Sequence, residues 1–292
     1  MTENEFLLQD RLQKIQQVIE KYGEENFYIS FSGGKDSTVL HHLIDQALPG
    51  NRIPRVYANT GIEYNMIISF VKSLAEKDDR IQIITPKVNI KQTLEDEGYP
   101  FKSKAHSKWL DLYQRNGMTQ SIKNYLGTDE KTKDLYRTCP KQLFYQFSDD
   151  FSLRCSDHCC LRMKEEPIAQ WKKEHGKKYG ILGVRRAEEG RRSNANCLAL
   201  RKGNLYNFQP LVPVSDAWEE WYIKEYDIDI CALYKPPYCL TRTGCKGCPF
   251  ALHLQEELDM LEKFFPAERK QCEIIWEPVY TEYRKIKYRL KK

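Results

Sequence analysis

Tyr28-Ile-Ser-Phe-Ser-Gly-Gly-Lys-Asp-Ser-Thr38 is the stretch that decides the fold. Residues 27–31 predict a short buried strand, residues 32–37 a turn around two glycines, and residues 38–47 a helix with one apolar side. Glycines allow a tight curl in which successive N–H groups point into one concavity, and the following helix directs its positive end to the same place. We therefore expect a phosphate or pyrophosphate to bind here.

Side chains of the same stretch also suit an anion. Lys35 would add a positive charge, and Ser32, Ser37 and Thr38 would add hydroxyl donors. The stretch is not a Walker loop, because Asp36 follows the lysine where that pattern has Ser or Thr. A glycine turn without a ligand is the alternative that these residues leave open.

The order of the other elements predicts the fold class. Apolar segments indicate further strands at residues 54–58, 81–84 and 179–184, with helical spacing between them. Alternating strands and helices predict an α/β protein with a doubly wound, mostly parallel sheet. We expect three regions: an N-terminal helix in residues 1–25, a nucleotide domain in residues 26–235, and a cysteine segment with C-terminal helices in residues 236–292.

Ligands of such sheets bind at the carboxyl ends of the strands. Asn59-Thr-Gly61 follows the second predicted strand, as the glycine turn follows the first. The two turns are therefore expected to line one site. Its residues would be Ser30, Ser32, Gly33, Gly34, Lys35, Asp36, Ser37, Asn59, Thr60 and Gly61. Arg185 and Arg186 leave the fourth strand in the same way and suit bidentate contact with phosphate or sulfate. A solvated charged turn is the alternative for the two arginines.

Residues 90–150 are predicted to be a helical insertion. It would either cover the nucleotide site or consist of ordinary connecting helices. In the rest of the chain, no apolar run reaches the length of a membrane span, and the first residues lack the features of a signal peptide, so we expect a cytoplasmic protein without a membrane partner. The net charge of +5 is compatible with a polyanionic partner but does not require one.

Ten cysteines are many for a chain of 292 residues in a reducing compartment, where metal binding is more common than disulfides. Cys159 and Cys160 are adjacent, and Cys245 and Cys248 form a Cys-x-x-Cys. Four thiolates suit either a tetrahedral zinc ion or a [4Fe–4S] cube. Adjacent side chains rarely converge on one small ion, so the pattern favours the cube.

These motifs resemble those of a known family. Ser-Gly-Gly-Lys-Asp-Ser resembles the PP-loop of ATP pyrophosphatases, ATP sulfurylases and the phosphoadenosine phosphosulfate (PAPS) and adenosine phosphosulfate (APS) reductases. Cys-Cys with Cys-x-x-Cys resembles the cluster signature of the Fe–S-containing reductases, and Gly183-Val-Arg-Arg-Ala-Glu188 resembles their anion-contacting element. Asn59-Thr-Gly61 resembles their Asp-Thr-Gly turn, with Asn in place of Asp.

The resemblance implies a PP-loop, Rossmann-like enzyme that reduces or transfers the sulfur group of an adenine nucleotide. It implies PAPS, APS or ATP as nucleotide, with Mg²⁺ for ATP, and a [4Fe–4S] cluster on Cys159, Cys160, Cys245 and Cys248. Lys35 would be catalytic. The reductases' C-terminal Glu-Cys-Gly motif is missing, so the nucleophilic thiol would come from Cys272 or from a thiol or electron-donor protein.

Two other functions compete with sulfonucleotide reduction. An ATP-dependent PP-loop sulfurtransferase would adenylate and thiolate tRNA, DNA or another acceptor, and an intact Gly-Gly-Lys loop fits the β-phosphate of ATP. This alternative adds nucleic acid as a candidate partner. A non-catalytic nucleotide sensor or zinc-stabilised binding module is the third hypothesis. The sequence leaves the choice of substrate, the sulfur acceptor, the oligomeric state and the roles of Cys155 and Cys239 open.

Overall fold

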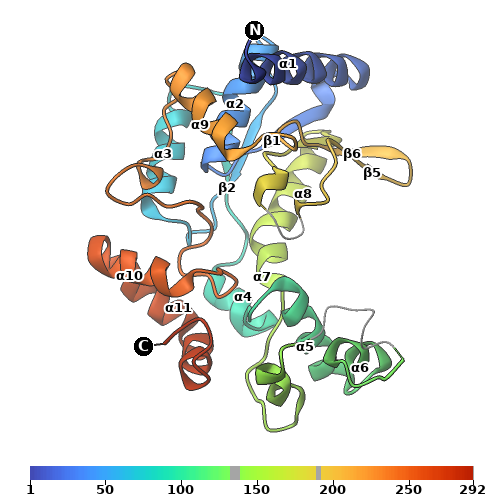
Figure 1. Ribbon diagram of the computed structural model, residues 1–292, viewed down its shortest axis with the longest axis vertical. Coiled ribbons are helices and arrows are strands. Elements are labelled where there is room, and N and C mark those ends of the chain that lie inside the picture. Colours follow the sequence, from blue (N-terminus) through green and yellow to red (C-terminus); the bar gives the residue numbers. More distant parts are fainter. Residues whose placement is uncertain (132–138, 189–191, 292) are drawn as a thin grey trace. The chain divides into compact units, whose positions relative to one another are not determined.

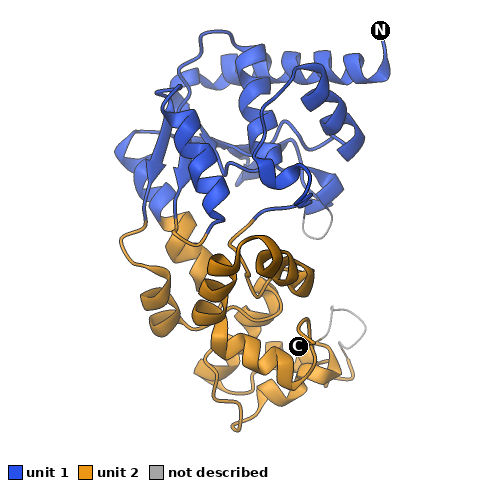
Figure 2. Cartoon of the chain, turned by 90° about the vertical axis from the view of Figure 1, so that its left-hand side faces the viewer, with its two compact units in different colours: residues 1–59, 63–85, 167–243 blue, residues 60–62, 86–166, 244–292 orange. Residues whose placement is uncertain are grey.

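The computed structural model describes residues 1–131, 139–188 and 192–291, so residues 132–138 of the predicted insertion lie outside it. The chain forms two compact units, each assembled from segments far apart in sequence (Figure 2). The first unit comprises residues 1–59, 63–85 and 167–243, and the second comprises residues 60–62, 86–166 and 244–292. Residues around 90–150 and the C-terminal helices, which the sequence analysis treated as separate regions, therefore belong to the same unit.

A sheet forms the centre of the first unit (Figure 1). Its strands in the described residues are β1 (Phe27–Ser30), β2 (Arg55–Ala58), β3 (Ile81–Ile84), β4 (Tyr179–Ile181), β5 (Leu198–Arg201) and β6 (Asn204–Phe208). They lie in the order β3-β2-β1-β4-β6-β5, and neighbouring strands are parallel except for the antiparallel pair of β5 and β6. The predicted α/β class with a mostly parallel sheet is confirmed, whereas the β5–β6 hairpin was not predicted.

Helices cover both faces of this sheet. The helical elements of the first unit are α1 (Glu3–Tyr22), η1 (Glu24–Asn26), α2 (Lys35–Ala47), α3 (Asn65–Ala75), α8 (Glu166–Glu174), η4 (Arg186–Glu188), α9 (Asp216–Glu225) and η6 (Ala232–Tyr234). Successive side chains of a strand point to opposite faces. Phe27 and Ile29 accordingly join a buried cluster with α1, α2 and α9, while Tyr28 packs against Trp171 of α8 with ring centroids 5.7 Å apart.

The strand order places a switch point beside β1. The chain leaves β1 toward β2 and β3, then returns to β4 on the other side of β1. In open α/β sheets the crevice at the carboxyl ends of two such strands is where ligands bind. The loop after β1 and the segment after β4 begin at this point, which positions the candidate site described below.

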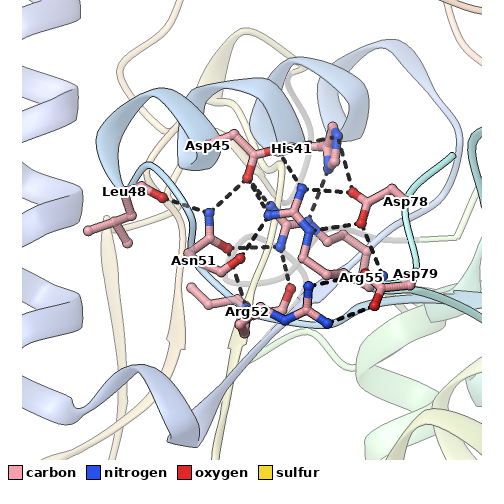
Figure 3. A network of polar contacts seen from close by, with 10 residues as sticks. His41, Asp45, Leu48, Asn51, Arg52, Arg55, Asp78 and Asp79 are labelled. Atoms are coloured by element: carbon pink, nitrogen blue, oxygen red, sulfur yellow. Dashed lines mark hydrogen bonds and ion pairs between the residues drawn. The ribbon is translucent and has the colours of Figure 1, made fainter.

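A polar network closes the opposite edge, at the amino ends of β2 and β3 (Figure 3). Arg55 donates to Asp45 at 2.5 Å, and Arg80 donates to Asp45 and to Asp78, each at 2.8 Å. Burial and the charge of Arg55 lower the pKa of His41 to about 4, so its neutral Nδ1 accepts from Arg55 Nε at 3.0 Å. Within the described residues, one group of three possible metal ligands has its ligand atoms within 4.8 Å of one another, namely His41, Asp45 and Asp78. Guanidinium groups already neutralise both carboxylates, so the network joins α2 to the strands.

The described part of the second unit is helical. Its elements are α4 (Ile90–Glu97), α5 (Lys104–Asn116), α6 (Gln120–Leu126), η2 (Lys141–Phe147), α7 (His158–Cys160), the π-helical turn η3 (Leu161–Glu165), α10 (Leu254–Phe264) and α11 (Pro266–Lys285). Aromatic rings fill its core; those of Phe101 and Tyr283, for example, lie 4.6 Å apart between centroids. Across all described residues, the helices are too short or too polar to cross a membrane.

Candidate nucleotide site and cysteine cluster

The loop between β1 and α2 depends on its two glycines. Gly33 has a φ of +69°, and a Cβ there would lie 2.5 Å from Cγ2 of Val71. A Cβ at Gly34 would lie 3.1 Å from the Tyr234 hydroxyl and 3.2 Å from Ser32 Oγ. A side chain at Gly33 would be strained and would clash, and one at Gly34 would press on two hydroxyl groups. Gly33 is therefore required by the shape of the loop, and Gly34 leaves room for the two hydroxyl groups.

The hydroxyl groups of the loop bond to the loop itself. Ser37 Oγ and Thr38 Oγ1 donate to the carbonyl of Gly34 at 2.9 and 3.0 Å, and Ser32 Oγ lies 3.0 Å from Ser37 Oγ. These bonds fix the turn after β1. Their expected role as donors to a ligand stays a prediction.

Helix α2 presents its amino end at this loop. It begins at Lys35, so the prediction of a helix start at Thr38 is wrong. Gly34, the residue before the helix, supplies no capping side chain, although the Lys35 N–H bonds to the Tyr234 hydroxyl. The 13 residues of α2 align their peptide dipoles with the positive end at the loop. The end of β1 thus has the backbone geometry of an anion site.

Two cations and three carboxylates surround the loop. Lys35 Nζ lies 3.0 Å from an oxygen of Glu219, and Arg185 lies 3.2 Å from the same carboxylate. Arg185 also pairs with Asp216 at 2.6 Å and with Asp36. Arg185 and Glu219 are both buried, so their charges act in a medium of low polarizability where Coulomb interactions are strong.

Arg185 and Arg186 diverge from each other. β4 ends at Ile181 rather than at residue 184 as predicted, and the following segment runs along α2, where a Cβ at Gly183 would lie 3.1 Å from the carbonyl oxygen of Asp36. This path directs Arg185 to the loop. The exposed Arg186 instead donates through Nε to the carbonyl of Ala195 at 2.9 Å. Of the two predicted arginines, the structure brings Arg185 to the glycine loop.

The other predicted nucleotide contacts divide between the units. Ser30 ends β1, and Asn59 follows β2 with its N–H bonded to the carbonyl of Ile84 at 2.8 Å. Both therefore lie at the edge of the sheet that carries the loop. Thr60 and Gly61 belong to the second unit. Their contact with a nucleotide stays a prediction.

The four cysteines of the predicted cluster all lie in the second unit. The pKa of the Cys159 thiol is raised well above its usual range by Cys160, by burial, and by the charges of Cys248 and Cys245. Burial and the charges of Cys245 and Cys160 likewise raise the pKa of Cys248. The thiol of Cys160 differs, because a hydrogen bond from Cys159 and, against burial, the charge of Lys104 lower its pKa to about 6. Four thiols that repel one another as thiolates form a donor set that a cation stabilises.

The spacing of these sulfur atoms can be compared with that of a single zinc site. A tetrahedral zinc ion with Zn–S bonds of ~2.3 Å brings its four sulfur atoms within roughly 3.8 Å of one another. In the part of the chain that the structure describes, no three of the four sulfur atoms lie within 4.8 Å of one another. The four thiols as described therefore do not have the spacing of one tetrahedral zinc site.

Helix α11 supports the Cys-x-x-Cys turn. Three buried side chains of this helix donate to backbone carbonyl oxygens of the turn. Trp276 donates to Lys246, Tyr280 to Gly247, and Tyr283 to Pro249. From α10, Glu257 accepts the N–H of Gly247 at 3.0 Å. These bonds fix the backbone on which Cys245 and Cys248 are carried, as outer groups around a metal site commonly do.

Cys272 lies beneath the same turn. Gly247 has a φ of +60°, and a Cβ there would lie 2.8 Å from Cys272 Sγ. The Cys272 side chain has no exposed surface, and burial raises its pKa to about 12. A buried, protonated thiol is a poor nucleophile. The geometry therefore does not support the predicted catalytic role of Cys272 and indicates a packing role.

Sequence reasoning missed Glu219 and the supporting side chains of α11. Glu219 lies between Trp218 and Trp221 in α9, and an acidic residue on the buried side of an aromatic helix was a signal that it has a buried cationic partner. The tyrosines of α11 gave no local signal, because their acceptors are carbonyl groups of a distant turn. The hydroxyl of Tyr234 also lies near the loop, 3.1 Å from the position of a Cβ at Gly34.

Comparison with known proteins gives a match over most of the chain. A family model described as the phosphoadenosine phosphosulfate reductase domain matches residues 26–133 and 128–251. An uncharacterized protein of Methanocaldococcus jannaschii is 26% identical over 261 residues, which cover 84% of this chain and 49% of that protein. The chain thus spans about half the length of this curated relative.

Solved structures similar to this chain include three nucleotide-related enzymes. The PAPS reductase of Candida auris in a phosphate complex has a TM-score of 0.43 at 14% identity, over 80% of this chain and 93% of that one. The FMN adenylyltransferase of Candida glabrata has a TM-score of 0.47 at 13% identity, over 82% and 61%. The U34-tRNA thiolase of Methanococcus maripaludis with its [4Fe–4S] cluster has a TM-score of 0.43 at 15% identity, over 98% and 80%.

Proposed function

Because the chain belongs to the phosphoadenosine phosphosulfate reductase family, we propose that it is an enzyme that binds an adenine nucleotide and reduces or transfers a sulfur group. The observation that carries this proposal is the loop after β1, where the start of α2, the glycine required at position 33 and the cations Lys35 and Arg185 meet at the switch point of the sheet. Each feature favours a phosphate or sulfate group at this place.

Within this proposal, the residues of the loop have separate tasks. The N–H groups at the start of α2 bind the oxygens of the nucleotide's anionic end, and Lys35 neutralises the charge that develops there. Arg185 orients a second oxygen through its planar guanidinium. Ser30 and Asn59 line the same edge. With ATP as substrate, Mg²⁺ would share the phosphate oxygens.

We further propose that Cys159, Cys160, Cys245 and Cys248 bind a [4Fe–4S] cluster. Their mutual repulsion supports a shared cationic centre, and the adjacent Cys159 and Cys160, which rarely converge on one small ion, favour a cube. A bound cluster would supply redox-active iron and sulfide. The chain's own contribution is the turn fixed by α10 and α11, which carries two of the four ligands.

The first candidate reaction is reduction of PAPS or APS to sulfite. Since Cys272 is buried with a raised pKa, the thiol that attacks sulfur would come from a partner thiol or electron-donor protein. The family supports this reaction, because its matching model is that of a sulfonucleotide reductase domain.

The second candidate reaction is ATP-dependent sulfur transfer to tRNA, DNA or another acceptor. One observation favours it: an intact glycine–lysine loop at the start of α2 suits a β-phosphate. In this reaction Lys35 would stabilise the pyrophosphate that leaves when the acceptor oxygen is adenylated.

Identification of products distinguishes the two reactions. Anaerobically purified protein would be incubated separately with ATP, APS and PAPS, with a thiol donor and with RNA or DNA. Sulfite from PAPS or APS indicates reduction, and pyrophosphate from ATP, stimulated by nucleic acid, indicates transfer. Binding of none of the three nucleotides would contradict the proposal.

A substitution at the loop tests the same site. Lys35→Ala removes a charge-assisted contact worth about 1.5–3 kcal/mol, so we expect roughly tenfold to hundredfold weaker nucleotide binding. Loss of affinity for ATP but not for PAPS would place the β-phosphate at Lys35. Lys91→Ala, at an exposed lysine of α4 in the second unit, is the matched control and should leave the affinity unchanged.

A further inference from the structure

The carboxylate of Glu219 lies where the cations of the loop meet. Its side chain has no exposed surface. One oxygen lies 3.0 Å from Lys35 Nζ and 3.2 Å from Arg185, whereas the other oxygen, Oε1, has no hydrogen-bond partner in the described structure. A buried carboxylate with one unsatisfied oxygen is costly, because nothing replaces the hydrogen bonds of water at that atom.

The charges around Glu219 do not favour a second anion. The charged groups facing it are Lys35 and Asp36 from α2 and Arg185 from the segment after β4, while Asp216 of its own helix pairs with Arg185. When all of these groups are ionised, the two positive charges of Lys35 and Arg185 face the three negative charges of Glu219 and the two aspartates. A phosphate group that entered this arrangement would add further negative charge beside a buried carboxylate.

We propose that Glu219 is the counter-ion of Lys35 and Arg185 in the nucleotide-free protein, and that it takes up one proton from solvent when the anionic group of the nucleotide binds these cations. This inference rests on the proposed nucleotide site and adds a proton to its binding reaction. Glu219 acts through the two cations, so it is a positioning residue rather than a group that touches substrate.

The burial of Glu219 distinguishes it from the other two carboxylates. Asp36 and Asp216 retain 27% and 67% of their side-chain exposure, so water stabilises their charged forms. Burial and the charge of Asp36 already raise the pKa of Glu219 to about 7, even with both cations beside it. When a phosphate draws Lys35 and Arg185 away and adds negative charge, the pKa of Glu219 rises further.

The direction of the pH dependence follows from this shift. Above about pH 7 the free protein has lost the proton of Glu219, whereas the nucleotide-bound protein retains it. Binding must then take up a proton, and the affinity falls by as much as about tenfold for each pH unit above that value. Below about pH 7 both states carry the proton, so this contribution to the pH dependence disappears.

Calorimetry of the whole chain measures this proton directly. ATP and PAPS would be titrated into the wild-type chain about one pH unit above the pKa of Glu219, in two buffers with different enthalpies of ionisation. We expect an uptake of close to one proton per bound nucleotide. Glu219→Gln should abolish the uptake, flatten the affinity above pH 7 and bind nucleotide more tightly there, since a competing anion is gone.

Two further variants make the test specific. Glu220→Gln changes the exposed neighbour on the same helix and should retain the proton uptake. Glu219→Asp retains a carboxylate and should restore part of the pH dependence. Should Glu219→Gln fail to fold, the wild-type measurement still decides, because nucleotide binding without proton uptake would overturn the inference. A wild-type chain that binds neither ATP nor PAPS would instead contradict the proposed nucleotide site itself.

Discussion

Gly247 lies directly against the side chain of Cys272, since a Cβ at this glycine would approach Cys272 Sγ to 2.8 Å. The glycine belongs to the turn between Cys245 and Cys248, and the cysteine belongs to α11. The contact connects the two features that the sequence left unrelated, the Cys-x-x-Cys and the last cysteine of the chain. Cys272 is thereby part of the platform beneath the proposed cluster.

Gly247→Ala should disrupt the cluster turn. Alanine at a φ of +60° costs about 1–3 kcal/mol, and its methyl group would also clash with Tyr280 and Cys272. We expect a lower melting temperature and loss of most of the iron, measured by metal analysis after anaerobic purification. Gly244→Ala is the matched control, because a Cβ there meets no atom within 4 Å. Equal iron in both variants would contradict the supporting role of the turn.

Cys272→Ala should show whether Cys272 has a packing role or a catalytic role. Removal of a buried thiol costs about 1–2 kcal/mol of unfolding free energy, but the proposed cluster and the chemistry depend on other residues. We expect near-normal iron content and turnover with a reduced melting temperature. Cys248→Ala, in contrast, should lose iron. A folded, iron-loaded Cys272→Ala protein without activity would restore Cys272 as the nucleophile.

Gly33→Ala should impair the nucleotide loop more than backbone strain alone predicts. Gly33 and Gly50 have similar positive φ angles of +69° and +78°, but a Cβ at Gly33 would lie 2.5 Å from Val71, while one at Gly50 meets nothing within 4 Å. Gly50→Ala therefore measures the strain, about 1–3 kcal/mol. Denaturant unfolding and ATP binding should both be more strongly reduced in Gly33→Ala. Indistinguishable variants would show that the loop tolerates a side chain.

His41 should make the first unit sensitive to mild acid. Its folded pKa of about 4 is below the usual 6.5, so the unfolded chain binds the extra proton between these values. The stability contributed by neutral His41 is present above about pH 6.5 and is lost as the pH falls toward 4. His41→Gln, whose amide oxygen can still accept from Arg55, should flatten unfolding free energy over this window. His253→Gln, at an exposed position, should not.

Most of the fold was predictable from local sequence patterns, but the start of α2 was not. The strand at residues 81–84 matches β3, and the buried apolar strand before two glycines marked the loop after β1. The start of α2 was placed three residues late, because Gly34 gives no capping side chain and the hydroxyls of Ser37 and Thr38 turn back to its carbonyl. A helix start without a capping residue has little signal in sequence.

The candidate site was predictable only in part, for a different reason. Lys35 and Arg185 follow strands, so the topology rule located them. Glu219 has no such position, and its partners Lys35 and Arg185 lie far away along the chain. The spacing of the cysteines indicated one metal centre, but the burial of Cys272 depends on how α11 packs against Gly247. Long-range packing of this kind has no local pattern.

Metal analysis of the anaerobically purified protein tests the central claim most directly. We predict a brown protein with about four irons and four inorganic sulfides per chain, and loss of the colour in serine variants of Cys159, Cys160, Cys245 and Cys248. The pyrophosphate and sulfite assays would then be interpreted on a loaded enzyme. A colourless protein that contains one zinc ion per chain and no iron would contradict the account.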